Sequence, residues 1–184
     1  MTEHRAAIEV RDLVRITVLG YGLTLMFGAI GSMLLANSFG QLLLYELGDA
    51  TGIMASVLSA RYVGLRGQHI AASAFILMGI THGISLAGTG VEGLNSQKSI
   101  TLIMPMIPAM VLMTWCSLFP KWLRLSALLP AALFVYVYIR VLSGAPYIDW
   151  PTSTAYFLWN ISEVLWAVFM LLDLRKQPQA SATI

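Results

Sequence analysis

Long apolar runs separated by short polar segments dominate the chain from end to end. Runs of about 20 residues, the length of an α-helix that crosses a bilayer, lie near residues 14–36, 68–88, 100–120, 125–145 and 153–173. The stretch 41–61 is also apolar, except for Glu46 and Asp49. The pattern alone leaves two interpretations of this stretch: a membrane-crossing helix that carries two acids, or the edge of a water-soluble loop.

The basic residues decide between these interpretations, because Lys and Arg collect on the cytoplasmic side of short connections. If 41–61 crosses the membrane, one side holds Arg5, Arg11, Arg15, Arg61, Arg66, Lys121, Arg124, Arg175 and Lys176, which leaves Lys98 and the membrane-embedded Arg140 elsewhere. If it does not cross, this bias is lost. We therefore expect an all-α polytopic protein of the cell (inner) membrane, with six transmembrane helices and both termini in the cytoplasm.

Composition points to the same class of protein. The 184 residues are 58% hydrophobic and 11% charged, with a mean hydropathy of +0.75, whereas a soluble domain carries about 25% charged residues. We expect a single six-helix transmembrane domain over residues 1–184, with short cytoplasmic tails at 1–12 and 177–184. The formal net charge of +2 gives no reason to expect nucleic acid, and the single Cys116 excludes an internal disulfide.

Small residues at four-residue spacing predict where the helices approach one another closely. They are Gly20, Thr24, Gly28, Ser32 and Ala36 in the first run, Gly48, Gly52, Ser56 and Ala60 in the second, and Gly79, Gly83 and Ala87 in the third. Pro105, Pro108 and Pro130 lack a backbone donor, so we expect kinks near them.

Two segments suggest an internal duplication. "SAFILMGITHGI" (73–84) and "TAYFLWNISEVL" (154–165) align without gaps at an offset of 81, which places His82 opposite Glu163. Since three helices separate the copies, the halves would run in opposite directions, as in the 3+3 inverted repeats of many transporters. The first and fourth runs align poorly at this offset, so chance similarity is the alternative.

Polar groups inside the apolar runs are the candidates for function, because a charge at the bilayer centre costs about 2.5–3.5 kcal/mol on insertion scales. By their positions along the runs, Glu46, Asp49, His82, Arg140, Asn160 and Glu163 all fall in the outer half of the membrane, and Tyr156 and Trp159 lie near Glu163 on the last run. We predict that these eight residues form a ligand- or proton-binding site. Arg140 would neutralise one carboxylate, and His82 would relay a proton.

A structural interpretation of the same residues stays open. Glu46 and Asp49 would then lie at the outer headgroup boundary, Arg140 would reach that boundary by its long side chain, and Glu163 would be a buried structural acid. The distances among these side chains distinguish the two interpretations.

Three functions fit the sequence. The first is a small carrier or channel for a proton, a cation or a small solute. The second is a binding or accessory protein that holds a lipid-like ligand or packs in a larger membrane complex or homo-oligomer. The third is a lipid-modifying enzyme, which no nucleophile motif or acidic metal cluster supports. We expect membrane lipids as partners and no cofactor, since a haem would need facing histidines that the chain lacks.

A short piece of the chain, "GITHGIS" (79–85), resembles the insulin-induced gene proteins, which are sterol-regulated membrane proteins of six helices with a similar G-I-x-H before a loop. The resemblance covers four residues. It implies a lipid-like ligand, and we assign no family from it.

Overall fold

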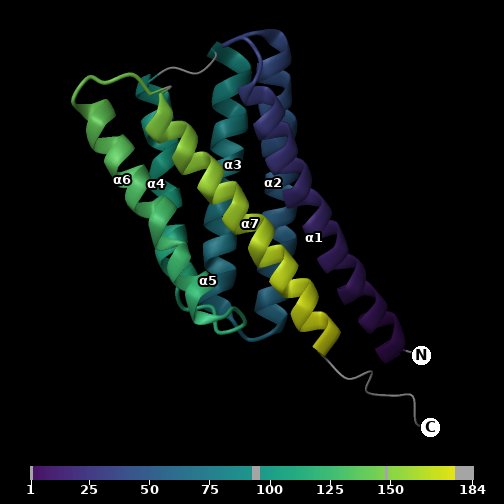
Figure 1. The fold of residues 1–184 in the computed structure, drawn as a ribbon. Coiled ribbons are helices and arrows are strands. Elements are labelled where there is room, and N and C mark those ends of the chain that lie inside the picture. The colour runs from purple at the N-terminus through teal and green to yellow at the C-terminus, as the bar shows by residue number, and fades with distance from the viewer. Residues whose placement is uncertain (1, 93–95, 148, 177–184) are drawn as a thin grey trace.

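The computed structural model describes residues 2–92, 96–147 and 149–176, and within these ranges every regular element is a helix (Figure 1). The all-α prediction is confirmed. The helices are α1 (Thr2–Ser32), α2 (Phe39–Leu65), α3 (His69–Glu92), α4 (Ser96–Met113), α5 (Lys121–Ser126), α6 (Leu128–Leu142) and α7 (Trp150–Lys176).

Five segments of the described chain are long and apolar enough to cross a membrane: Glu9–Ser32, Phe39–Leu65, His69–Gly88, Lys121–Leu142 and Trp150–Lys176. The stretch 41–61, for which the apolar pattern left two interpretations, therefore lies within a helix of membrane-crossing length and not in a loop. The predicted span 100–120 corresponds to α4, which already ends at Met113 and whose described apolar part, Met104–Met113, is shorter.

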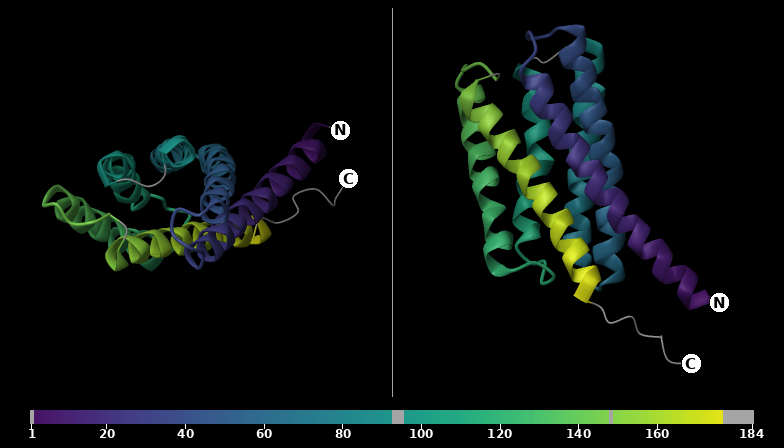
Figure 2. Two further views of the ribbon diagram at one scale, coloured as in Figure 1. Left: turned by 90° about the horizontal axis from the view of Figure 1, so that it is seen from above. Right: turned by 45° about the vertical axis from the view of Figure 1, so that its right-hand side comes forward.

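The long helices form a ring in chain order. Each of α1, α2, α3, α4, α6 and α7 packs against its neighbours along the chain, and α7 returns to pack against α1 (Figure 2). The first residues of α1 and the last residues of α7 lie at the same end of the bundle, together with the α2–α3 and α4–α5 connections (Figure 1). We call this the terminal end, and the opposite end, which carries the α1–α2 and α6–α7 connections, the loop end.

The surface of the ring is apolar and part of its interior is polar, the reverse of a soluble protein. Large apolar side chains face outward on every long helix, for example Leu19, Val57, Ile76, Ile139 and Phe157. Buried polar side chains lie between the helices, among them Thr17, Thr24, Ser56, Ser59, His82, Ser162 and Glu163. An apolar exterior is stable in a lipid environment, so the arrangement agrees with a membrane-embedded bundle.

Glycines in the left-handed region end two of the helices. Gly67 (φ 75°) follows the last residues of α2, and Gly144 (φ 88°) follows those of α6. In both cases the next amide donates back over five residues, from Gln68 to Val63 and from Ala145 to Arg140. These bonds satisfy carbonyls that the helix end leaves free, and they turn the chain sharply into the next element.

Several of the small-residue positions are helix contacts, as predicted, but Ala36 lies in the connection after α1, and Ser32, Ala36 and Ala87 are exposed. A Cβ on Gly20 would lie 2.9 Å from the Cβ of Ala55, and one on Gly79 would lie 3.4 Å from the Cβ of Ser56. Thr24 Oγ1 lies 3.1 Å from the Gly48 carbonyl oxygen, to which it can donate, and 3.0 Å from Thr51 Oγ1, which joins α1 to α2.

The proline predictions had mixed outcomes. The break between α5 and α6 falls at Ala127, three residues before Pro130, where a proline removes a helical hydrogen bond. Pro105 and Pro108 lie inside α4, which is one helix from Ser96 to Met113, and the kink near them stays a prediction.

Candidate functional site

Three ionisable side chains from three helices meet inside the ring. His82 on α3 places Nδ1 2.8 Å from Asp49 Oδ1 on α2 and Nε2 3.3 Å from Glu163 Oε1 on α7. His82 and Glu163 are buried, whereas the Asp49 side chain keeps 14% of its surface exposed. We call Asp49, His82 and Glu163 the acid–histidine triad.

The triad lies deep in the bundle. Asp49 is ten residues from the loop end of α2, His82 ten residues from that of α3, and Glu163 thirteen residues from that of α7. At 1.5 Å per residue this is about 15–20 Å along each helix. In a bilayer of about 30 Å aligned with the bundle, such a position would be near the middle, where isolated charges are most costly.

For both contacts of His82 to be hydrogen bonds, the triad needs one proton more than a neutral imidazole and two carboxylates carry. Neutral histidine donates from one ring nitrogen only, yet both nitrogens of His82 face carboxyl oxygens. Two hydrogen bonds form either when an imidazolium donates twice or when one carboxyl group is protonated and donates to the ring. In both states the triad carries a net charge of −1, and loss of the proton would leave −2.

The sequence provides space for the His82 ring through a glycine on the facing helix. A Cβ at Gly52 would lie 2.6 Å from both Cε1 and Nε2 of His82, closer than side-chain carbons approach one another. Gly52 comes three residues after Asp49 and therefore lies on nearly the same face of α2. The missing side chain lets α3 bring His82 between the two acids.

An aromatic side chain holds the other side of the imidazole. The Trp159 indole stacks on the His82 ring, with ring centroids 4.5 Å apart and planes inclined by 29°. Its N–H lies near the Glu163 carboxyl group but outside hydrogen-bond geometry. Glu163 Oε2 and Asn160 Oδ1 are buried and have no hydrogen-bond partner among the described residues. Oxygens in this state can accept a bond from a ligand or water.

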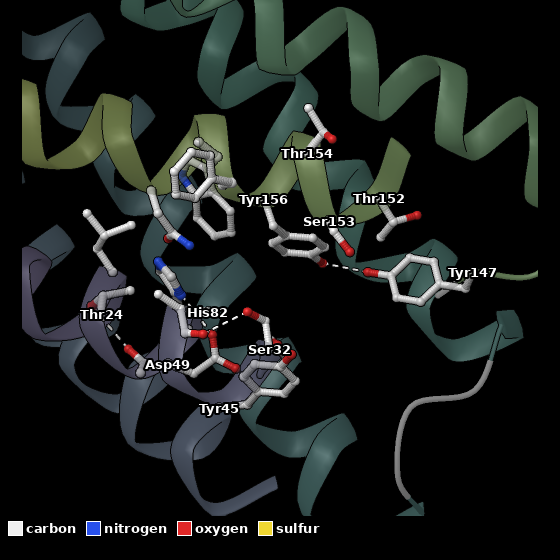
Figure 3. Close-up of a pocket in the computed structure, with 18 residues that line it drawn as sticks. Thr24, Ser32, Tyr45, Asp49, His82, Tyr147, Thr152, Ser153, Thr154 and Tyr156 are labelled. Carbon is white, nitrogen blue, oxygen red and sulfur yellow. Dashed lines mark hydrogen bonds and ion pairs between the residues drawn. The ribbon is translucent and has the colours of Figure 1, made fainter. Parts of the chain in front are cut away.

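A cavity of about 450 Å³ reaches the triad from the loop-end half of the ring (Figure 3). Its lining comes from α1, α2, α3 and the N-terminal part of α7 together with the connection before it. The lining residues are Thr24, Leu25, Gly28, Ala29, Ser32, Tyr45, Gly48, Asp49, His82, Ser85, Tyr147, Thr152, Ser153, Thr154, Tyr156, Phe157, Trp159 and Asn160. Because Ser32, Ser153 and Phe157 are exposed, the cavity is open to the surroundings of the bundle.

The terminal-end half of the ring is closed by packed side chains. Below Glu163, the Trp166 ring on α7 contacts Phe75 of α3 edge-on at 5.9 Å between centroids and stacks on Phe119 at 6.5 Å. Further along, the Tyr62 hydroxyl donates to Asp173 Oδ2 at 2.8 Å, and Arg66 contacts the same oxygen at 2.9 Å. The cavity therefore approaches the triad from the loop-end half of the bundle, and packed side chains lie on the other side of the triad.

The structure brings together six of the eight predicted site residues. Asp49, His82 and Glu163 form the triad, and Tyr156, Trp159 and Asn160 lie beside it on α7 and line the cavity. Their roles in binding stay predictions, but their proximity favours a shared site over scattered structural positions.

Glu46 and Arg140 lie elsewhere. Glu46 is half-buried on α2 and is not among the residues that line the cavity. Arg140, at the end of α6, pairs with Asp149 in the connection to α7 and lies over the Tyr136 ring at 5.8 Å. The expectation that Arg140 neutralises a site carboxylate is wrong, because its nearest acid belongs to its own helix connection. The site carboxyl groups of Asp49 and Glu163 face His82 instead.

Several lining residues were missed by sequence reasoning. Hydroxyl groups of Thr24, Ser85 and Thr152 border the cavity, and Tyr147 reaches it from the α6–α7 connection, where its hydroxyl lies 2.6 Å from that of Tyr156. Thr24 could have been identified, because it is one of the small residues at four-residue spacing in the first apolar run. Hydroxyl residues are otherwise too common in membrane helices to be singled out.

Comparison with protein families, with curated proteins and with solved structures found no match for this chain. The class of protein therefore rests on its own features: apolar helices of membrane-crossing length, an apolar exterior and a buried polar site open to a cavity. These features define a helical membrane protein.

Proposed function

We propose that this protein is a small membrane carrier that exchanges a proton bound at the acid–histidine triad for a small solute bound in the adjoining cavity. The observation that carries this proposal is the histidine whose two ring nitrogens both face carboxyl oxygens, at the end of an open cavity in an otherwise apolar bundle. A proton is a necessary part of this arrangement, and Asp49 connects it directly to the solute space.

The one-sided cavity favours a carrier over an open channel. A channel needs a continuous path, whereas here Trp166, Phe75 and Phe119 fill the ring between the triad and the terminal end. In a carrier, such packing is the closed side of an alternating-access cycle. The contacts of Asp173 with Tyr62 and Arg66 join α2 to α7 at that side and would have to open for release.

The proposal is tested in lipid vesicles that contain the purified protein and a pH-sensitive dye. The vesicles are loaded with a small-molecule filtrate of cells and diluted into a more acidic medium without filtrate. Proton uptake should be faster than in protein-free vesicles and should depend on the filtrate. Glu163→Gln should reduce the rate to that of protein-free vesicles, because the amide cannot take part in the proton exchange.

Glu46→Gln is the matched control, since it removes an acid from α2 outside the cavity lining. Its proton uptake should equal that of the unmodified protein. Equal rates for Glu163→Gln and the unmodified protein would overturn the proposal. The alternative from the sequence, a binding or accessory protein without turnover, predicts no filtrate-dependent uptake in any of these vesicles.

A further inference from the structure

The charge of the cavity lining indicates what kind of solute it accepts. Among its lining residues, the acidic or basic side chains are Asp49 and His82, and no Lys or Arg is present. With its proton, the triad has a net charge of −1, and Asp49 is the acid in contact with the cavity. In a bundle of low dielectric constant, this charge attracts cations and excludes anions.

The walls of the cavity are aromatic. Tyr45, Tyr147, Tyr156, Phe157 and Trp159 all contribute to its lining. Figure 3 shows Tyr45 near Asp49 on one side of the cavity, and Tyr147 and Tyr156 on the other. Tyr45 and Asp49 are four residues apart, so they share a face of α2. A carboxylate among aromatic rings is the setting in which ring faces bind organic ammonium groups, within about 6 Å of the ring centroid.

The size of the cavity and its polar groups further limit the class of solute that it can bind. A volume of about 450 Å³ lies within the range of about 300–1,000 Å³ typical of sites for small organic molecules, and far exceeds that of a bare metal ion. Among the described residues, no group of three or more His, Cys, Asp or Glu side chains, the triad included, is arranged so that it could hold a metal ion. Buried Asn160 Oδ1 lacks a partner in the described chain and can accept a bond from an N–H group.

We infer that the solute is a small organic cation with an aromatic or aliphatic body, and that it binds beside Asp49 between the tyrosine rings in exchange for the proton of the triad. The inference rests on the proposed carrier function. The exchange balances in charge: one monovalent cation enters as one proton leaves, and the site changes from −1 with the proton to −1 with the cation.

The exchange follows from the contact between Asp49 and His82. A cation beside Asp49 competes with the imidazole for the same carboxylate and repels a positive charge on His82, which lies 2.8 Å from Asp49 Oδ1. The titratable groups around His82 are Asp49 and Tyr45 on α2, Glu163 and Tyr156 on α7, and the buried Tyr21 on α1, which lies near Glu163. In α4, residues 104–113 carry no titratable side chain.

The test uses the full chain in lipid nanodiscs and benzyltrimethylammonium, whose charge does not change with pH. Binding is measured by calorimetry in buffers that differ in ionisation enthalpy, which counts the protons released. Neutral 3-phenylpropan-1-ol and anionic 3-phenylpropionate serve as comparison ligands. We expect saturable binding of the cation, at least about tenfold tighter than that of either comparison ligand, with release of about one proton per cation.

Asp49→Asn should weaken binding of the cation by about tenfold or more, whereas Glu46→Gln, three residues earlier on the same helix, should leave it unchanged. Equal binding of the neutral alcohol, tighter binding of the anion, or no binding of the cation would overturn the assignment of the solute class. If the cation fails to bind while filtrate-dependent proton uptake still requires Glu163, the solute class is wrong and the carrier proposal stands. If the cation binds without proton release and no uptake occurs, the exchange proposal fails and the cation site stands.

Discussion

Gly52 is the residue at which the triad depends most directly on backbone space. Its missing side chain leaves room for the His82 ring, and a Cβ there would lie 2.6 Å from two atoms of that ring. We predict that Gly52→Ala displaces His82 and destabilises the protein by about 1–3 kcal/mol, the usual cost of overpacking. Unfolding in mild detergent, followed by the fluorescence of the tryptophans, measures the change.

Gly22→Ala is the control for this substitution. Gly22 also lies in a long helix, α1, but a Cβ there has no neighbour within 4 Å. Alanine should therefore leave stability unchanged or raise it by up to about 1 kcal/mol through helix propensity. If the two variants unfold alike, the close approach of α2 to His82 has no energetic consequence.

The residues of the triad were predictable from sequence, because the bilayer makes an unpaired charge costly and so marks each buried ionisable group as a candidate. The locations of two other predicted site residues, Arg140 and Glu46, were not predictable. Arg140 lies at the end of α6, where the fold of one connection gives it Asp149 as a partner. Glu46 lies only three residues before Asp49, yet it is not among the residues that line the cavity. Sequence spacing does not fix which way a helix faces its neighbours.

At the scale of elements, the contact between α2 and α7 at the terminal end combines a buried hydrogen bond with a partly exposed ion pair. Tyr62 donates to Asp173, and Arg66 pairs with the same carboxylate. We predict that Asp173→Ala costs about 1–3 kcal/mol, since it removes a charged hydrogen-bond acceptor of a buried hydroxyl. Asp173→Asn keeps an acceptor for Tyr62 and should cost less, about 0–1 kcal/mol. Chemical unfolding of the detergent-solubilised protein tests both values.

A more exposed ion pair between α1 and α2 provides a comparison for the stability contribution of the Asp173 contact. Arg61 on α2 lies 2.6 Å from Glu9 of α1, but both side chains are more than half exposed. Glu9→Gln should change stability by less than about 1 kcal/mol, because solvent screens such a pair. A larger loss for Glu9→Gln than for Asp173→Ala would contradict the view that burial, and not the number of charges, determines the strength of these contacts.

The helices were predictable as elements because the apolar runs are long, and glycine or proline marks several of the connections, such as Gly67, Pro120 and Gly144. Their exact ends were not. The run 100–120 predicted one span, but α4 stops at Met113 and a new helix begins at Lys121. Hydropathy does not distinguish apolar residues of a helix from apolar residues of a packed connection. Cys116 and Phe119 belong to the connection between α4 and α5, and both are buried. The 3+3 repeat stays a prediction: the contact between His82 and Glu163 suits equivalent positions near a two-fold axis, but it is a single pair.

At the scale of the whole molecule, the ends of the bundle differ in charge, and this difference predicts its orientation. Arg61, Arg66, Lys121 and Arg124 lie at or near the connections of the terminal end, where α1 begins and α7 ends. Among the side chains that the structure describes, Arg140 is the basic residue near the loop end, where it is paired. Because Lys and Arg collect on the cytoplasmic side, we predict that the terminal end faces the cytoplasm and that the cavity opens at the outer half of the membrane.

Cysteine labelling tests this orientation. Burial raises the pKa of the native Cys116 thiol to about 11, so it reacts slowly with maleimides, and Cys116→Ala removes it altogether. In that background, Ser143→Cys places an exposed thiol at the loop end and Ser117→Cys places one at the terminal end. A membrane-impermeant maleimide added to intact cells should label Ser143→Cys at once and Ser117→Cys only after the cells are permeabilised. The opposite pattern would mean that the protein has the reverse orientation and that the proton is taken up from the cytoplasm. Labelling of both thiols in intact cells would mean that the chain inserts in two directions.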